Sequence, residues 1–363
     1  MGFYINIINR ALVQFPIVAF LLTLPYMFYC YRKYGSVSLL RSLIVFSFIF
    51  YIQCAYYMVI LPLPDPASLV DMPSMAPQLI PFKFVADLVR ESSFSPAEPT
   101  TYITALKEMC VLQPLFNIAL TIPFGIYMSY YFGKGLKQVI LYSLLLSLFF
   151  EITQLTGLYG IYPKAYRLFD VDDLMLNTLG GAIGWHISVP LKALLPGKER
   201  IDQASRLRAR DVSFSRRFCA YLADYAAVMG IVYCISAAFK AGSFPIYYLA
   251  AVALYFVLQP AVSGGKTLGK RLVRIRVEGP ASARATLPAL AARYGAREAV
   301  FLYIQSFQSI RLVVGPEYMN AFILAELAII LFCAVDFAGS FRREKRLWYE
   351  MISKTRNVSS AAG

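Results

Sequence analysis

Residues 11–31 read ALVQFPIVAFLLTLPYMFYCY and contain no charged side chain. At 1.5 Å of rise per residue, a helix of about 20 apolar residues crosses roughly 30 Å of hydrocarbon. The run is too long for the apolar core of a signal peptide, and no A-x-A-like cleavage site follows it, so we expect it to stay as a membrane anchor. Several other stretches of similar length carry almost no charge, which predicts a protein that crosses the membrane many times.

The composition points the same way. Of 363 residues, 58% are hydrophobic and only 15% are charged, and the mean hydropathy is +0.57. In a water-soluble protein about half of the residues are hydrophobic and about a quarter are charged, so this composition excludes a water-soluble protein. The net charge of +14 would suit nucleic acid, but Lys and Arg lie mainly in short segments between apolar runs, as the positive-inside rule requires. We expect the lipid bilayer, and no nucleic acid, as the partner.

Cysteine and histidine offer little for metal or nucleophilic chemistry. His186 is the single histidine of the sequence, so a His-based triad, a His-ligated zinc or a haem pair has almost nothing to be built from. The six cysteines stand singly in or beside apolar runs and are interpreted as small buried hydrophobes. No cofactor is evident from these residues. The cysteines are Cys30, Cys54, Cys110, Cys219, Cys234 and Cys333.

The apolar runs predict an all-α, polytopic membrane helix bundle of about nine transmembrane helices. The helix over 298–315 is predicted less from its hydropathy than from the basic tail, which returns to the cytoplasm only if this segment crosses the membrane. A shorter interfacial helix there would leave eight spans and an external tail. The expected helices cover residues 11–31, 39–62, 109–132, 137–157, 174–195, 218–239, 244–262, 298–315 and 319–341.

Charge asymmetry predicts the orientation, with the amino terminus outside and the carboxyl terminus cytoplasmic. The loops after the first and third spans are basic, as is the stretch 192–217, whereas the loop 63–108 is proline-rich and carries acids such as Asp65 and Asp71. The basic tail RREKR, Arg342–Arg346, returns to the cytoplasm. We expect a five-span domain over 1–195, a basic cytoplasmic linker over 196–211, a second membrane domain over 212–358, and a short tail over 359–363.

Polar side chains from three spans of the first domain lie at one depth. Asn117, Glu151 and Asn177 fall about 5–12 Å inside the expected outer boundary at 1.5 Å per residue. Each is costly in a membrane unless it is paired. Further polar residues share these helix faces or lie at the start of the fifth span: Gln154, Arg167, Asp170 and Asp173.

This cluster admits three interpretations. Glu151 in a low dielectric could donate or accept a proton. The acidic and amide oxygens could instead ligate a divalent cation, while Arg167 grips a phosphate or carboxylate group. The third interpretation is a self-neutralising network that fixes helix packing. Gly180, Gly181 and Gly184 lie inside an apolar span, so they favour close helix contact over a phosphate loop.

Three motifs resemble the VanZ-like family: N-x-x-x-x-x-P-F-G at 117–125, E-x-x-Q at 151–154, and R-x-F-D-V-D-D-L-x-x-N-T-x-G-G-x-x-G at 167–184. Q-L-I-P-F at 78–82 also resembles that family, and the similarity covers about residues 10–195.

The resemblance implies a bacterial cytoplasmic-membrane protein that lowers sensitivity to teicoplanin-type glycopeptides. It would bind or act on an anionic envelope component, such as a peptidoglycan precursor, at the outer leaflet. Rival hypotheses are an ion or small-solute transporter, with Glu151 and Asp224 along one path, and a structural scaffold without catalysis. The roles expected from the first hypothesis are acid, base or ligand for Glu151, anion clamp for Arg167, cation or partner ligands for Asp170 and Asp173, and a hydrogen-bonding frame from Asn117, Gln154 and Asn177.

The second domain has an acidic residue inside a predicted membrane span and basic residues that alternate with apolar ones. Asp224 lies two turns inside the membrane from Arg217, and it needs that arginine or another cation as a partner. Residues 272–277 alternate apolar with basic side chains, which predicts a strand with one positive face. Arg271 stands where a phosphate loop needs Ser or Thr, so a nucleotide loop is excluded. We expect anionic phospholipid headgroups to contact Lys270, Arg271, Arg274 and Arg276.

R-R-F-C-A-Y-L-A-D at 216–224 and G-G-K-T-L-G-K-R-L-V-R-I-R-V at 264–277 resemble the RDD family of membrane domains over about 212–358. A third element of that family reads H-D followed by Thr, and here it is Tyr349, Glu350 and Thr355. The acid is kept but the histidine is lost, which weakens the case for a proton relay. The resemblance leaves ion or proton transport open. The structural alternative is an ion network of Arg217, Asp224 and Glu350 that holds the helices at the cytoplasmic lip.

Overall fold

The computed structural model describes residues 2–63, 65, 76–238, 244–311, 315, 318–339 and 346–360. Some predictions fall outside these residues. They are those for Asp71 in the acidic loop, residues 312–314 of the eighth expected span, residues 342–345 of the basic tail, and residues 361–363 at the end of the predicted tail.

The chain divides into two compact units, and each is described by itself. The first comprises Met1–Phe20 and Leu39–Ile201, and the second comprises Leu21–Ser38 and Asp202–Gly363. The first part of helix α1 therefore belongs to one unit and the rest to the other. The sequence had predicted the whole of this helix in the first domain.

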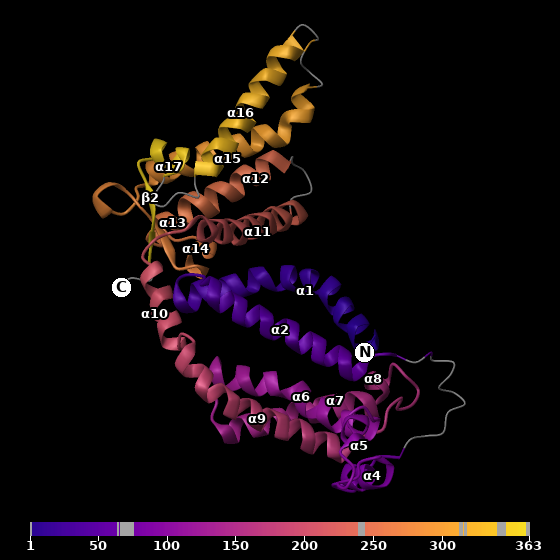
Figure 1. The fold of residues 1–363 in the computed structure, drawn as a ribbon. Helices are drawn as coiled ribbons and strands as arrows, with labels where there is room; N and C mark the ends of the chain where they lie inside the picture. The colour runs from indigo at the N-terminus through magenta and orange to yellow at the C-terminus, as the bar shows by residue number, and fades with distance from the viewer. Residues whose placement is uncertain are drawn as a thin grey trace. The chain divides into compact units, whose positions relative to one another are not determined.

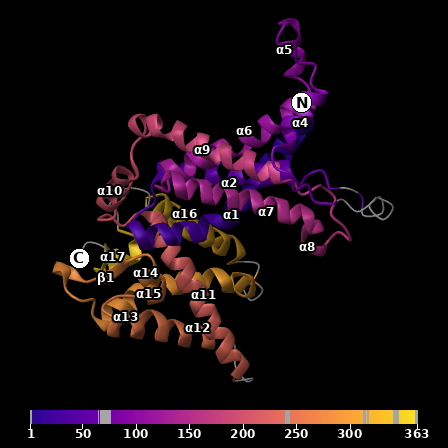
Figure 2. The same cartoon turned by 90° about the horizontal axis from the view of Figure 1, so that it is seen from below.

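The first unit is helical, and α6, α7 and α9 run side by side in it (Figures 1 and 2). Its long helices are apolar along most of their length, as the sequence predicts. The helices of this unit are the first part of α1 (Gly2–Tyr34), α2 (Leu39–Ile60), α4 (Lys83–Glu91), α5 (Thr100–Ala105), α6 (Met109–Tyr130), α7 (Leu136–Leu155), α8 (Gly157–Gly160), α9 (Val171–Leu194) and the first turn of α10 (Lys198–Arg208), which the division splits after Ile201.

The second unit adds a small sheet to its helices. Its hydrophobic core lies where α11, α12, η1 and α15 pack together. The elements are α11 (Phe214–Ala238), α12 (Phe244–Val252), the π-helix η1 (Ala253–Leu258), α13 (Gln259–Val262), α14 (Leu268–Leu272), β1 (Ile275–Glu278), the 3-10 helix η2 (Pro280–Ser282), α15 (Leu287–Arg311), α16 (Met319–Gly339), α17 (Trp348–Ile352) and β2 (Arg356–Ser359).

Within the described residues, each of the nine predicted segments is largely helical, but only six of the helices there qualify as candidate membrane spans. By length and composition, the candidate spans are in α1, α2, α6, α7, α11 and α16. The helix α9 is long enough, but its glycines, Asn177 and His186 dilute its apolar character. The apolar run Ile246–Val262 is shorter, and α15 begins at Leu287, where its first half carries several charges. The predicted orientation of the termini is not supported by any structural observation.

The helices α6 and α9 approach each other so closely that side chains are excluded between them. A Cβ added at Gly180 would lie 2.1 Å from the carbonyl oxygen of Ile118, and one added at Gly184 would lie 2.1 Å from that of Ile122. Gly181 is likewise enclosed, by a side chain of α7. The prediction that these three glycines serve close helix contact is confirmed.

The strand predicted over 272–277 is present in part: Leu272 ends α14, and β1 begins at Ile275. The strand β1 pairs antiparallel with β2, and Ile275 lies opposite Ser359. Side chains alternate along this stretch because one face packs on the core of the second unit. The buried residues are Val273, Ile275 and Val277, and the exposed ones between them are Arg274 and Arg276.

Candidate functional site

Three helices of the first unit carry polar side chains that meet in its interior. The amide of Asn117 on α6 donates to the carboxylate of Asp173 at the start of α9. The amide of Asn177 on α9 donates to the hydroxyl of Ser147 on α7 over 2.8 Å, and that hydroxyl lies 3.3 Å from the carbonyl oxygen of Asp173. The structure thus brings together the helices that the sequence placed at one depth. We call the residues Asn117, Ser147, Glu151, Asp170, Asp172, Asp173 and Asn177 the outer cluster.

The acidic members of the outer cluster are held by backbone N–H groups. Glu151 is 2% exposed, and its Oε2 accepts from the N–H of Asp170 over 3.0 Å. The Asp170 carboxylate caps α9 by accepting from the N–H of Asp172 over 2.8 Å. Asp172 accepts from the N–H groups of Phe82 and Phe84 at the start of α4, at 2.6 and 2.9 Å. These N–H donors stabilise the negative charges, because helix N-termini favour anions.

The outer-loop segment that begins at Gln78 docks beside this acidic helix start. The Gln78 N–H donates to the carbonyl of Phe169 over 2.8 Å, and its carbonyl accepts from Val171 over 3.1 Å. The Gln78 side chain reaches within 3.4 Å of the Asp170 carboxylate. Burial raises the pKa of Asp170 above its ordinary value, and the Asp172 N–H acts in the opposite direction.

Arg167 and Gln154 both donate hydrogen bonds to backbone carbonyls at the end of α2. The Arg167 guanidinium donates to the carbonyl oxygens of Val59 over 2.8 Å and Leu61 over 3.0 Å. Gln154 also donates to Val59 over 2.9 Å. Both side chains therefore cap the carboxyl end of α2, where unpaired carbonyls carry negative partial charge. None of the ion pairs found in the described part of the chain involves Arg167.

Replacing Arg167 with glutamine is expected to destabilise the first unit by about 1–3 kcal/mol, because the carbonyls of Val59 and Leu61 lose charge-assisted bonds. The midpoint of unfolding of the purified protein in detergent measures this. The exposed Arg200 on α10 gives a matched control, since Arg200→Gln removes the same charge without touching α2. Equal midpoints for the two variants would contradict the capping role.

Metal binding gains no support from the described residues. In the parts of the chain that the structure describes, no three His, Cys, Asp or Glu side chains are grouped to hold a metal ion. Each carboxylate of the outer cluster accepts from at least one N–H group, which suits a network that stabilises the packing of α6, α7 and α9. Among the described residues, the amide oxygen of Asn177 has no hydrogen-bond partner.

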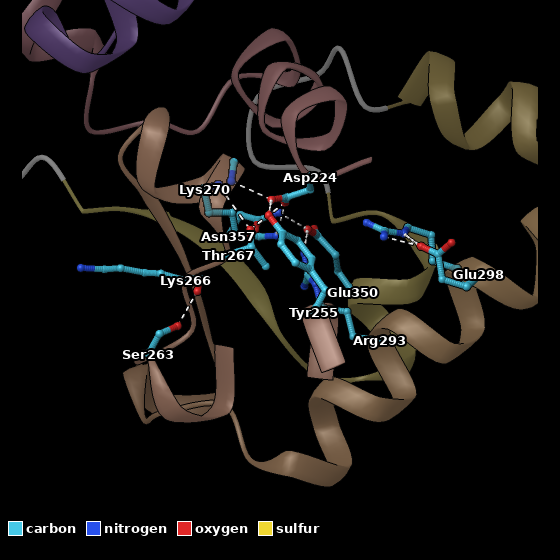
Figure 3. Close-up of polar contacts among 12 residues, drawn as sticks. Asp224, Tyr255, Ser263, Lys266, Thr267, Lys270, Arg293, Glu298, Glu350 and Asn357 are labelled. Atoms are coloured by element: carbon cyan, nitrogen blue, oxygen red, sulfur yellow. Dashed lines mark hydrogen bonds and ion pairs between the residues drawn. The ribbon is translucent and has the colours of Figure 1, made fainter. Parts of the chain in front are cut away.

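In the second unit, Asp224 is the centre of a buried network (Figure 3). It is 1% exposed and pairs with the ammonium of Lys270 at 3.6 Å. It accepts from the hydroxyls of Thr267 and Tyr255 at 2.7 and 2.8 Å and from the N–H of Gly269 at 2.7 Å. The cation that the sequence required is therefore Lys270, which comes from α14.

Glu350 is the second buried acid (Figure 3). Its Oε1 pairs with the guanidinium of Arg293 at 2.8 Å and accepts from the Asn357 amide at 2.6 Å. Arg217 lies 3.7 Å from its other oxygen, and Arg293 also donates to Thr355 over 2.6 Å. The structure joins the predicted residues Arg217 and Glu350 and gives Asp224 other partners.

Sequence reasoning missed the charged residues of α15. Arg293 and Arg297 lie four positions apart and share one helix face. Arg297 pairs with Glu298 through an Nε–Oε1 contact of 2.6 Å, and the Tyr248 hydroxyl donates to the same carboxylate. The spacing of these charges at the start of a segment interpreted as a weak span was the available signal.

The expected lipid-contacting residues separate into two groups. Arg271, Arg274 and Arg276 are exposed, and Arg276 pairs with Glu278 at 2.7 Å. Lys270 is buried beside Asp224 and lines a pocket of the second unit instead of its exposed surface. The exposed members of the predicted lipid-contacting set are therefore the three arginines.

Comparison with protein families agrees with the two-unit organisation. Residues 48–192 match the VanZ/LLP1 family, and residues 212–354 match the RDD family. No match was found among curated proteins or among solved structures. The chain therefore carries two membrane domains in tandem, the first of the VanZ/LLP1 family and the second of the RDD family.

Proposed function

We propose that this protein acts in the bacterial cytoplasmic membrane and lowers sensitivity to teicoplanin-type glycopeptides. Its VanZ/LLP1 domain would bind or act on an anionic envelope component, such as a peptidoglycan precursor, at the outer leaflet. The proposal includes the predicted orientation, with the amino terminus and the loop 63–108 outside and the carboxyl terminus in the cytoplasm. The link to glycopeptides rests on the family, and the position of the site rests on the outer cluster.

The observation that carries the proposal is the convergence of acids and amides from α6, α7 and α9 at one place, where Glu151, Asp172 and Asn177 are buried. A protein gains little stability from burying a carboxylate unless the group is used or fully paired. Among the residues that the structure describes, Glu151 accepts one hydrogen bond, from the N–H of Asp170, so it keeps acceptor capacity for a proton or a ligand group. Glu151 is accordingly the proposed acid, base or ligand, with Asp170 and Asp173 as its neighbours.

The proposal is tested by replacing Glu151 with glutamine in a strain that lacks the wild-type gene. We expect Glu151→Gln to reach wild-type abundance in the membrane but to lose most of the protection against teicoplanin, since an acid or base contributes about 100-fold or more to rate. Growth inhibition and quantitative immunoblotting of membranes measure the two quantities. The exposed Glu199 on α10 supplies the matched control, Glu199→Gln.

The same experiment separates the rival interpretations. A scaffold predicts that Glu151→Gln lowers abundance and protection in proportion, because the side chain then acts only through packing. An abundant Glu151→Gln protein that protects as well as the wild type would overturn the proposed site. Asp173→Asn, which keeps the bond with Asn117, and Arg167→Gln give further comparisons in the same strain.

A second candidate function is transport of an ion or small solute, and the buried pair of Asp224 and Lys270 favours it. Ionisable pairs inside membrane domains often line translocation paths. In this case Asp224→Asn should abolish flux in proteoliposomes while the protein remains folded. Unchanged flux would remove this candidate.

A further inference from the structure

A pocket of about 270 Å³ lies in the second unit beside the network of Figure 3. Ligand pockets for larger molecules span roughly 300–1,000 Å³, so this one suits a small polar group. Its lining comes from α11, α14, α15, α17 and β2. We define the basic pocket by the residues that carry its chemistry: Arg217, Lys270, Arg293, Tyr294, Arg297 and Asn357.

The charges around the basic pocket leave a positive excess. Four cations line it, whereas Asp224 is the one acid among the lining residues. Glu350 and Glu298 neutralise part of this charge through their pairs with Arg293 and Arg297. Four cations against three carboxylates give the site one net positive charge, which favours an anion.

Aromatic rings hold these cations in place. The Arg297 guanidinium lies 4.3 Å from the ring centre of Phe256 and 5.1 Å from that of Tyr294, and the Lys270 ammonium lies 5.2 Å from the Tyr294 ring. Burial raises the pKa of Tyr349, which also lines the pocket, to about 12, so its phenol is neutral near pH 7. A cation stacked on a ring keeps its N–H groups for another acceptor.

Two buried donors of the basic pocket have no protein acceptor. Among the described residues, the Tyr294 hydroxyl and the Arg293 Nε–H have no hydrogen-bond partner, although these side chains are only 1% and 2% exposed. The amide oxygen of Asn357 also lacks a donor. Buried polar groups are nearly always satisfied, so a partner with acceptor oxygens and a hydroxyl would complete the hydrogen bonds of these atoms.

We propose that the basic pocket binds a phosphoryl group. Its donors approach from α11, α14 and α15, and a tetrahedral phosphate can accept from several directions, whereas a carboxylate offers two oxygens in one plane. Arginine binds phosphate with paired N–H groups. A hydroxyl of the ligand, on the phosphate itself or on an attached glycerol, would donate to Asn357. The group could belong to free phosphate or to an anionic lipid headgroup.

Tyr294→Phe is the sharpest test, because it removes the unpartnered hydroxyl and keeps the ring on which the cations stack. We expect the full-length protein in detergent to bind inorganic phosphate saturably in calorimetry, and we expect Tyr294→Phe to weaken that binding about tenfold, the usual size for a bond to a charged group. A purely structural hydroxyl predicts unchanged binding. Tyr233→Phe, at an exposed position of α11, is the matched control.

A second arm distinguishes the two sources of the phosphoryl group. The protein is placed in nanodiscs of phosphatidylcholine with or without phosphatidylglycerol, and its unfolding temperature is measured with and without inorganic phosphate. Stabilisation by phosphatidylglycerol alone, reduced in Tyr294→Phe, would assign the pocket to a lipid headgroup. Stabilisation by free phosphate would assign it to a soluble ligand.

The proposal fails if neither phosphate nor phosphatidylglycerol gives an effect that depends on Tyr294. It also fails if chloride at the same ionic strength reproduces the shift. A second variant separates binding from folding: Arg297→Gln is measured against Arg206→Gln, which removes an exposed charge of α10. Equal phosphate affinity in these two variants would overturn the proposal.

Discussion

Replacing Asp224 with alanine is expected to destabilise the RDD domain by about 3–5 kcal/mol, the largest loss we expect from one side chain of that domain. The variant leaves Lys270 buried without its acid at 3.6 Å. It also leaves Thr267, Tyr255 and the Gly269 N–H without their acceptor. Removing one partner of a buried pair costs far more than the pair contributes, because the remaining charge has lost its solvent and its counter-ion.

Unfolding of the purified protein in mixed micelles, followed by circular dichroism, measures this loss. The double variant Asp224→Leu with Lys270→Met removes both charges, and we expect it to be less destabilised than Asp224→Ala alone. Asp211→Ala at an exposed position is the control and should change stability by less than about 0.5 kcal/mol. If the destabilisation of the double variant equals the sum of the destabilisations of its two single variants, the two side chains are not coupled.

Leucine in place of Gly184 is expected to destabilise the VanZ/LLP1 domain by about 3 kcal/mol or more, at the upper end of overpacking effects. Its Cβ would lie 2.1 Å from the Ile122 carbonyl, and this obstacle is backbone that cannot rotate away. The helices α6 and α9 would have to separate, which also pulls Asn117 away from Asp173. Both stability and the function of the outer cluster should therefore fall together.

The matched control uses a helical glycine with open surroundings. A Cβ at Gly230 on α11 meets nothing within 4 Å, so Gly230→Leu should leave the unfolding midpoint almost unchanged. Thermal unfolding in detergent compares the two leucine variants directly. A Gly184→Leu protein as stable as Gly230→Leu would show that α6 and α9 do not depend on this close approach.

The sequence predicted the position of every long helix, because uncharged runs of about 20 residues have few other stable structures in a membrane. It also predicted the glycine contact and the alternating strand, since both depend on local spacing. It overestimated the number of spans. Charge parity required the segment 298–315, but α15 begins earlier and places Arg293 and Arg297 in its first half.

The partners within each cluster were harder to predict. Asp224 plainly needed a cation, yet nothing in the spacing distinguishes Arg217 from Lys270, which are respectively 7 and 46 positions away along the chain. Similarly, Arg167 was assigned to an anion because arginine commonly binds one. Its hydrogen-bond acceptors are backbone carbonyls at the end of α2. Every residue has a backbone carbonyl, so the side-chain pattern of the sequence does not predict which one an arginine will bind.

The pairing of β1 with β2 has a consequence for synthesis. Ile275 of β1 pairs with Ser359 of β2, so the ribosome must translate the intervening helices before the partner strand exists. Until then the edge of β1 is open, and its N–H and C=O groups can recruit another nascent chain. A ribosome that stalls before Arg356 would therefore yield a product prone to aggregation, even with every membrane helix already inserted.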